Sequence, residues 1–301
     1  MKTLMITGAG GFFGSAVVKQ LSQSEKYRII AVTSGRKAND FPANVQADSA
    51  DLLSAGEALL ARHKPDILLH LAWGRQDGQA RNSAANIEWL EASLKLLRSF
   101  IENGGKRFVF AGTSSEYEDE DGLRRESAGK VQMSMYGETK RAFADVAKNY
   151  CKRVGVEFVD VRLFTLYGEN DRHELGAIPL CIRTLMKDEP FVCKAPNTIR
   201  DYVYVGDAAR AMEVILDSDY TGSVNVSSGQ PRSMRAVFSC IAYALGKREL
   251  LRFENETECG LILAGDNALL RDRIGYAQFT PFEEGMKKTV EWWISQYAPT
   301  L

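Results

Sequence analysis

The sequence predicts an α/β fold built on a doubly wound parallel sheet, and three observations carry this prediction. Residues 1–165 alternate short apolar runs with longer amphipathic stretches, which is the rhythm of strands followed by helices. A glycine-rich turn, residues 8–14, separates the first apolar run from the first amphipathic stretch. The composition, with 45% hydrophobic and 26% charged residues, is that of an ordinary globular protein.

The elements of the first half follow from the period of the apolar residues. Short apolar runs bounded by turn residues predict strands at Lys2–Thr7, Tyr27–Thr33, Asp66–Ala72, Arg107–Ala111 and Glu157–Leu163. Apolar residues that recur every three to four positions predict helices at Gly14–Gln23, Leu52–His63, Asn82–Asn103 and Met135–Val154. Because strands alternate with helices, we expect parallel strands with helices on both faces of the sheet.

The glycine-rich turn predicts a dinucleotide site. Gly8, Gly11 and Gly14 lack the Cβ atoms that would hold a pyrophosphate away from the backbone. Phe12 and Phe13 lie in the same turn and are expected to contact the cofactor. The helix that follows aims its N-terminus at the phosphates, which stabilises their negative charge.

The second half of the chain is less regular. It predicts helices at Ile178–Met186, Val205–Leu216, Met234–Leu245 and Pro281–Tyr297, and short strands at Phe191–Cys193, Asp201–Tyr204 and Ser223–Val226. We therefore expect residues 1–165 to form a dinucleotide-binding domain and residues 166–301 to form mainly a smaller C-terminal α/β lobe that binds the substrate. Parts of residues 200–230 are expected to return to the first domain.

Bulk properties exclude several classes of protein. The 301 residues carry a net charge of −1, so the chain lacks the basic surface that binds nucleic acid or acidic membranes. No apolar run approaches the roughly 18 residues of a membrane span, and we expect no signal peptide. The five cysteines are scattered without metal-ligand spacing. We expect reduced thiols, no metal site and a cytoplasmic protein.

The end of the second strand indicates which dinucleotide is bound. The stretch 32–37 has no carboxylate for the ribose hydroxyls of NAD, whereas Ser34 and Arg36 suit the 2′-phosphate of NADP. The sequence therefore favours NADP over NAD, with a solvated basic loop as the alternative. Farther along, Asp48 is the candidate to accept a hydrogen bond from the adenine amino group, and Asp51 is the competing choice.

Tyr136 and Lys140 lie four residues apart, so they share one face of the helix expected at Met135–Val154. A lysine at that spacing stabilises a phenolate, which lets the tyrosine exchange protons near neutral pH. A dinucleotide site together with a tyrosine acid/base suggests hydride transfer at a carbon that bears oxygen.

Two further strand ends carry candidate ligands, because ligands bind at the carboxyl ends of parallel strands. The run Leu71-Ala72-Trp73 is expected to line the cofactor, and His70 before it is interpreted as a packed strand residue. The run Thr113-Ser114-Ser115 ends the next strand, and one of its hydroxyls is expected to bind the substrate oxygen beside Tyr136. A hydroxyl-rich turn without a ligand is the alternative.

Arg200 is the candidate for a phosphate in the second half, because a guanidinium binds phosphate oxygens bidentately. The alternative is an internal ion pair with Asp201.

The expected helix Asn82–Asn103 carries two apolar stripes, although a helix on a sheet needs only one. One stripe contains Ile87, Leu90, Leu94, Leu97 and Ile101, and the other contains Trp89, Ser93, Leu96 and Phe100. The second stripe predicts contact with another subunit, and packing against a neighbouring helix of the same chain is the alternative.

With these residues assembled, the chain resembles the extended short-chain dehydrogenase/reductase family, in its nucleotide-sugar epimerase, dehydratase and reductase branch. The resemblance covers nearly the whole chain. It rests on Thr7-Gly8-x-x-Gly11-x-x-Gly14, His70-Leu71-Ala72, the Thr113 turn, Tyr136-x-x-x-Lys140, Arg162-Leu163-Phe164, Tyr167-Gly168 and Arg200-Asp201-x-x-Tyr204-Val205.

The resemblance implies a Rossmann-type sheet and a smaller lobe that holds a nucleotide diphosphate sugar. By this likeness Tyr136 is the acid/base, and Lys140 favours its phenolate and binds the nicotinamide ribose. Thr113 corresponds to the hydroxyl that polarises the sugar carbonyl, and Arg200 to the arginine on the diphosphate. Many members are homodimers through the helices that correspond to residues 82–103 and 135–154.

Three departures from the family pattern bear on the reaction. Ser114 and Ser115 stand where 4,6-dehydratases carry an Asp-Glu pair, so dehydration is disfavoured. Thr165 replaces an asparagine that touches the sugar phosphate in many epimerases, so its role as a substrate contact is an expectation only. The acidic run 118–121 follows Tyr117, where a glycine is usual, and predicts an altered loop.

These observations favour an NADP-dependent reductase that acts on a nucleotide-linked 4-keto-deoxysugar, with Thr113, Tyr136 and Lys140 as its catalytic residues. The first alternative is an NAD-dependent nucleotide-sugar 4-epimerase that uses the same residues. The second is a non-catalytic, dinucleotide-sensing regulator on the same fold. The sequence names neither the sugar nor the nucleotide base.

Overall fold

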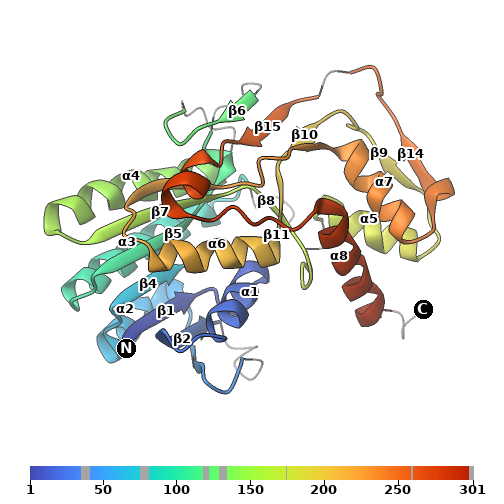
Figure 1. Ribbon diagram of the computed structural model, residues 1–301. Coiled ribbons are helices and arrows are strands. Elements are labelled where there is room, and N and C mark those ends of the chain that lie inside the picture. Colours follow the sequence, from blue (N-terminus) through green and yellow to red (C-terminus); the bar gives the residue numbers. More distant parts are fainter. Residues whose placement is uncertain are drawn as a thin grey trace.

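A seven-stranded sheet forms the centre of the protein in a computed structural model that describes residues 1–34, 41–74, 81–117, 122–128, 134–173, 175–258 and 260–297 (Figure 1). All of its strands are parallel. In spatial order they are β12 (Gly222–Val226), β7 (Glu157–Leu163), β5 (Arg107–Thr113), β4 (Ile67–His70), β1 (Lys2–Thr7), β2 (Tyr27–Thr33) and β3 (Gln46–Ser49). The predicted doubly wound sheet of Rossmann type is confirmed.

Helices cover both faces of this sheet (Figure 1). One face is covered by α1 (Phe12–Leu21) and α6 (Val205–Asp217). The other is covered by α2 (Leu52–His63), α3 (Ala85–Glu102) and α4 (Met135–Val154). Each helix buries the apolar stripe that its sequence period predicts, which explains why these segments fold as helices on a sheet.

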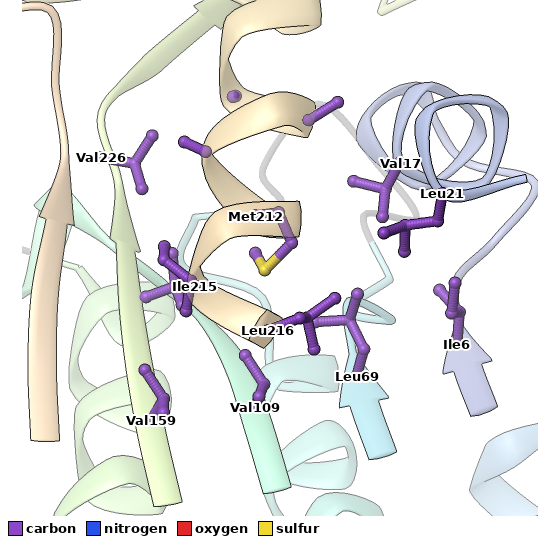
Figure 2. Packing of buried hydrophobic residues seen from close by; sticks show 14 of the residues in the cluster. Ile6, Val17, Leu21, Leu69, Val109, Val159, Met212, Ile215, Leu216 and Val226 are labelled. Atoms are coloured by element: carbon purple, nitrogen blue, oxygen red, sulfur yellow. The ribbon is translucent and has the colours of Figure 1, made fainter. Parts of the chain in front are cut away.

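The α6 helix shows how the core is packed (Figure 2). Met212, Ile215 and Leu216 on α6 are almost completely buried over the sheet, where Val109 and Val159 belong to the same apolar cluster. Burying an aliphatic side chain of this size contributes about 1.5–3 kcal/mol. This cluster fixes α6 and the strand that follows it, β12, to the part of the sheet formed by the first half of the chain.

The strand order reverses between β1 and β4, because the chain winds outward to β2 and β3 before it returns to β4. In doubly wound sheets the crevice at such a point, beyond the carboxyl ends of the strands, is where ligands bind. The glycine-rich turn follows β1 and the run Leu71-Ala72-Trp73 follows β4, so both lie at this point.

A second apolar cluster lies beside the sheet, with the three helices α5, α7 and α8 drawn together on one side of Figure 1. Its apolar core draws on residues from Tyr167 to Trp293. The elements that do not belong to the large sheet or to the helices on its two faces are β6 (Gly122–Arg124), β8 (Thr165–Tyr167), α5 (Ala177–Met186), β9 (Phe191–Cys193), β10 (Ile199–Arg200), β11 (Tyr202–Tyr204), β13 (Arg232–Ser233), α7 (Met234–Ala244), β14 (Leu251–Phe253), β15 (Ile262–Gly265), α8 (Phe282–Tyr297) and three short helical turns at Ser114–Glu116, Arg248–Leu250 and Leu269–Ile274. Of these, the strands β13, β10, β15 and β6 form a separate four-stranded sheet.

The structure extends or shortens several predicted elements. β5 continues to Thr113, two residues beyond the predicted end at Ala111, so the catalytic candidate Thr113 closes the strand itself. β3 was not predicted, because its sequence Gln-Ala-Asp-Ser is short and polar and it lies at the sheet edge. α3 begins at Ala85 rather than Asn82.

The bulk expectations have these outcomes within the described part of the chain. Cys151, Cys181, Cys193 and Cys240 are free thiols, and Cys259 lies outside the described residues. No group of three potential metal ligands occurs among the described residues. None of the helices described is both long enough and apolar enough to span a membrane.

Candidate active site

The glycine-rich turn joins β1 to α1 in a conformation that side chains would block. Gly8 has a φ of +69°, and a Cβ atom there would lie 2.8 Å from the Ala72 amide nitrogen. A Cβ on Gly14 would collide with the Gly8 carbonyl oxygen. Gly11 is the N-cap of α1 and brings no side-chain acceptor to the first amide groups of the helix. The turn therefore fits a pyrophosphate, whose oxygens are the acceptors that these amides lack.

The aromatic residues of this turn connect it to the second cluster. Phe12 and Phe13 are half-buried and pack against the apolar core that contains Tyr167 and Val205. Asn170, which follows β8, donates a 3.1 Å hydrogen bond from Nδ2 to Ser15 Oγ on α1. The predicted cofactor turn thus lies where the large sheet meets the second cluster.

His70 is a structural residue, as the sequence predicts. Its ring is buried between Thr7 Oγ1, 2.7 Å from Nδ1, and Ser93 Oγ, 2.9 Å from Nε2. Because Ser93 donates its own proton to the Trp89 carbonyl, Nε2 must be the protonated nitrogen and Nδ1 the acceptor from Thr7. Burial, aided by the Lys140 charge, lowers the pKa of His70 to about 3.

The run Leu71-Ala72-Trp73 leaves β4 beside the glycine turn. The Ala72 amide donates to Thr7 Oγ1 at 3.4 Å, and Trp73 Nε1 donates to Asn86 Oδ1 at 3.0 Å. The Trp73 ring centroid lies 5.2 Å from Lys140 Nζ. The structure therefore brings two of the predicted cofactor segments, residues 8–14 and 71–73, to the same point as the catalytic lysine candidate.

Tyr136 and Lys140 lie in the first turns of α4, at the end of β5. Lys140 Nζ donates a 2.7 Å hydrogen bond to the Ala111 carbonyl oxygen and lies 5.1 Å from the Tyr136 ring centroid. Lys140 is only 4% exposed, whereas Tyr136 is half-buried. The spacing that the sequence singled out therefore places a buried ammonium beside an accessible phenol ring.

The Thr113 turn packs directly against the start of α4. A Cβ on Gly137 would collide with the Ser115 carbonyl oxygen, so only glycine permits this approach. Thr113 Oγ1 accepts the Ser115 amide at 3.2 Å. Within the described residues the Thr113 hydroxyl acts only as a hydrogen-bond acceptor, so its proton remains for a ligand. Ser114 is buried and Ser115 is half-buried.

Two residues at this turn were missed by the sequence analysis. Glu116 accepts the Thr113 amide at 2.9 Å in a reciprocal capping arrangement with the Thr113 hydroxyl. The Thr-x-x-Glu spacing of a capping box is a signal that would have found it. Arg81 accepts the Tyr136 amide on its carbonyl at 2.8 Å and donates from its guanidinium to Ser115 Oγ at 3.3 Å. No sequence pattern indicates the position of Arg81, because it precedes α3 in irregular structure.

The substrate candidates Thr165 and Arg200 lie on neighbouring short strands. Thr165 begins β8, which pairs with β11, and Arg200 ends β10, just before β11 in the chain. The Thr165 amide donates to the Asp201 carbonyl at 3.1 Å. The Asp201 carboxylate accepts from the amides of Ser228 and Gly229 and from the Ser228 hydroxyl. The Asp201 carboxylate is therefore bonded to Ser228 and Gly229 rather than paired with Arg200, the alternative of the sequence analysis, and Arg200 is half-buried.

The residues predicted at the adenosine end are only partly described. Ser34 is exposed at the end of β2, and Arg36 lies outside the described residues. Asp51 is the N-cap of α2, where its carboxylate accepts the Leu53 amide. Asp48 on β3 accepts from His63 Nε2 at 2.7 Å, and this bond holds the pKa of the Asp48 carboxyl below its usual value. An adenine contact of Asp48 stays a prediction.

The parallel sheet, the glycine turn at the strand-order reversal and the Tyr-Lys pair define a dinucleotide-dependent enzyme of the extended short-chain dehydrogenase/reductase type. The family model described as "NAD dependent epimerase/dehydratase family" matches residues 4–227. The chain belongs to this family.

Individual relatives agree with this assignment. The uncharacterized UDP-glucose epimerase YtcB of Bacillus subtilis is 25% identical over 275 residues, which cover 84% of this chain and 85% of that protein. The dTDP-glucose 4,6-dehydratase of Neisseria meningitidis is 22% identical over 333 residues, which cover 98% of this chain and 94% of that protein.

Solved structures show the same architecture. A UDP-N-acetylglucosamine 4-epimerase from Methanobrevibacter ruminantium, in complex with UDP-N-acetylmuramic acid, matches with a TM-score of 0.82 and 26% identity over 98% of this chain and 99% of that chain. A UDP-glucuronic acid 4-epimerase from Bacillus cereus, in complex with UDP-glucuronic acid and NAD, matches with a TM-score of 0.86 over 98% of this chain and 100% of that chain. At 20% identity, this structural match shows the shared fold.

Proposed function

We propose that this protein is an NAD-dependent 4-epimerase of a UDP-linked sugar. The observation that carries the proposal is the placement of Tyr136, Lys140 and Thr113 at one strand end beside the glycine turn. The Methanobrevibacter ruminantium 4-epimerase, matched over nearly all of both chains, supports it. This function was the first alternative of the sequence analysis, and the relatives favour it over the reductase.

The residues of the glycine turn and of 71–73 are proposed to hold the dinucleotide. Gly8, Gly11 and Gly14 permit the close backbone turn before α1, whose first amides would bind the phosphates, and Trp73 lies beside Lys140. When bound, NAD supplies the two-electron oxidation and re-reduction of the sugar carbon.

Tyr136 is proposed to remove the proton from the sugar hydroxyl and later to return it. The ammonium of Lys140, 5.1 Å from the ring centroid, stabilises negative charge on the phenol oxygen. The Thr113 hydroxyl donates a hydrogen bond to the same sugar oxygen and holds it in place. Acid/base assistance of this kind contributes about 10²–10⁴-fold to the rate.

The second cluster is proposed to hold the nucleotide diphosphate. Arg200 lies on β10, just before the strand that pairs with β8, and the Asp201 carboxylate accepts three hydrogen bonds from Ser228 and Gly229. The guanidinium of Arg200 is therefore proposed to bind the diphosphate, with Thr165 close to the sugar. Ser114 and Ser115 provide hydroxyls rather than carboxylates beside Tyr136, which disfavours dehydration.

NAD is proposed in place of the NADP that the sequence analysis preferred. The family is described as NAD dependent, and the Bacillus cereus enzyme was solved with NAD. The residues that suggested NADP are Ser34, which is exposed, and Arg36, which lies outside the described residues.

A homodimer through α3 and α4 is part of the proposal. The stripe with Trp89, Ser93, Leu96 and Phe100 belongs largely to the core of the same chain, so its predicted contact with another subunit is wrong and the alternative, packing within the chain, is correct. Ile87 on the other stripe is 45% exposed. Val146 on α4 is 51% exposed. Mass measurement in solution of the wild type and of a Val146→Asp variant tests this, since a monomeric wild type contradicts it.

The test of the function separates an epimerase from a reductase. The purified protein is assayed with UDP-glucose, UDP-N-acetylglucosamine and UDP-glucuronic acid without added cofactor, and sugar products are separated by chromatography. The proposal expects an equilibrium mixture of C4 epimers and NAD released on denaturation. Stoichiometric consumption of NADPH with a 4-keto sugar, and no epimer formation, would replace the epimerase by the reductase.

A further inference from the structure

Two buried carboxyl groups lie behind the turn that carries Thr113. Glu116 is 1% exposed and Asp160, on β7, is 2% exposed. A Cβ atom on Gly112 would lie 2.8 Å from Glu116 Oε1 and would collide with Asp160 Oδ1. Both carboxyls therefore face the Cα of Gly112, at the end of the strand that Thr113 closes.

A single guanidinium lies between these acids. Arg162 Nε donates to Asp160 Oδ2 at 2.9 Å and lies 3.3 Å from Glu116 Oε2. Arg162 Nη1 donates to the Tyr117 hydroxyl and to the Glu126 carbonyl. One cation at contact distance therefore faces two buried carboxyls.

One oxygen of each acid lacks a hydrogen-bond donor among the described residues: Glu116 Oε2 and Asp160 Oδ1. A buried ionised oxygen without a donor is costly, whereas a proton held between two carboxyls removes one charge and supplies a donor. Burial and the neighbouring Asp160 raise the pKa of Glu116, and burial raises the pKa of Asp160, while Arg162 and Lys140 oppose both shifts.

The acid pair connects to the catalytic candidates through one hydrogen bond. Glu116 Oε1 accepts the Thr113 amide at 2.9 Å, while Thr113 Oγ1 accepts the Ser115 amide. The Ser115 carbonyl lies against Gly137, one residue from Tyr136. Glu116 therefore fixes the backbone from which the Thr113 hydroxyl points, and it reaches the substrate only through Thr113.

We propose that Glu116 and Asp160 form a buried acid pair that shares one proton at neutral pH, and that Glu116 is a positioning residue that orients the Thr113 hydroxyl toward the sugar oxygen. The catalytic part of this inference rests on the proposed function. The shared proton is a property of the folded chain and is tested without turnover.

The proton is tested by infrared spectroscopy. The C=O band of a protonated carboxyl is compared between the wild type, Glu116→Gln and Asp160→Asn at neutral pH, with deuterium oxide to identify it. The wild type is expected to show the band, and Glu116→Gln is expected to lose it. The titratable and charged groups that face the acid pair are Arg162 on β7, Lys140 on α4 and the Tyr117 hydroxyl, and all three are kept in these variants. Absence of the band in a folded wild type overturns the shared proton.

The positioning role is tested by a KM-against-kcat comparison. Glutamine keeps an acceptor for the Thr113 amide and imitates the neutral acid, so Glu116→Gln is expected to keep kcat within about twofold. Glu116→Ala loses the bond, and kcat is expected to fall about tenfold with KM for the UDP-sugar unchanged. The matched control is Glu126→Gln, because Glu126 accepts another backbone amide, that of Asn225 at 2.9 Å.

A pH profile separates positioning from a general loss of structure. The wild-type kcat is expected to fall on the alkaline side as the pair loses its proton, and Glu116→Gln is expected to shift that limb to higher pH. Equal losses of kcat in Glu116→Gln and Glu116→Ala, or none in either, overturn the positioning role. If Glu116→Ala does not fold, hydrogen exchange of the Thr113 amide is measured in the wild type and in Glu116→Gln instead. A rapidly exchanging Thr113 amide in the wild type also overturns the positioning role.

The two proposals fail in different ways. A wild type that turns over no UDP-sugar contradicts the epimerase but leaves the infrared band and the Thr113 amide exchange to be read. An active epimerase without a protonated carboxyl contradicts the acid pair alone.

Discussion

Lys140 Nζ lies 5.1 Å from the centre of the Tyr136 ring while its proton is held by the Ala111 carbonyl at 2.7 Å. The lysine is thus fixed by the strand and is not free to follow the tyrosine. A charge fixed before substrate arrives needs no reorganisation during the reaction.

Tyr136→Phe is expected to lower kcat by about 10²–10⁴-fold, because the ring remains beside Lys140 but the transferable proton is gone. NAD content after purification is expected to match that of the wild type. Epimer formation and bound NAD are measured on the same preparation. The control is Tyr150→Phe on the same helix, which is expected to be fully active. A Tyr136→Phe enzyme with normal kcat would remove this tyrosine from the mechanism.

Gly14→Ala is expected to abolish dinucleotide binding, because the new methyl group collides with the Gly8 carbonyl in the glycine turn. Gly11→Ala is the matched comparison: its Cβ would lie 3.2 Å from the same oxygen, so a smaller loss is expected. The measurements are NAD per protein chain and circular dichroism to confirm the fold. A folded Gly14→Ala protein with its full complement of NAD contradicts the assigned role of the turn.

Arg200→Ala is expected to raise KM for the UDP-sugar by roughly 10–100-fold, because it removes one or two charge-assisted hydrogen bonds to the diphosphate. Little change in kcat is expected. Bound NAD is expected to stay constant. Arg252→Ala, at an exposed position of β14, serves as the control for removing a positive charge from the same part of the chain. An unchanged KM would place the diphosphate elsewhere.

His70 is expected to make the protein sensitive to acid. Its pKa is about 3 in the folded protein, against an ordinary value of 6.5, so the unfolded chain binds a proton between these values that the folded chain does not. Stability from this residue is therefore complete above pH 6.5 and is lost as the pH falls toward 3. Thermal unfolding across this range, for the wild type and His70→Gln, is the measurement. A shallower pH dependence is expected in the variant, and identical curves would show that His70 titrates normally.

Much of the fold and part of the site were predictable because they depend on local patterns. The glycine turn has a fixed spacing, and the pair Tyr136 and Lys140 follows from the helical repeat alone. The parallel sheet follows from alternating strands and helices.

The remaining features depend on contacts between distant segments. The order of the strands in the sheet cannot be read from any local pattern. The same holds for the contact of Arg81 with Ser115 and for the acid pair of Glu116 with Asp160, because these residues are far apart in the sequence. β3, β10 and β13 are too short or too polar to show a strand period and exist because a neighbouring strand offers hydrogen bonds. The relatives, rather than any single residue, favoured the epimerase over the reductase.

The edge strand β12 comes from residues 222–226, more than fifty residues after its neighbour β7 ends at Leu163. A ribosome must therefore release β8, α5, β9, β10, β11 and α6 before the sheet can be completed. Until then the buried, valine-rich strand β7 exposes an unpaired edge, which is the kind of surface that recruits other chains into aggregates. A fragment cut after residue 165 is for this reason expected to aggregate during expression, and circular permutants that synthesise β12 early should escape the problem.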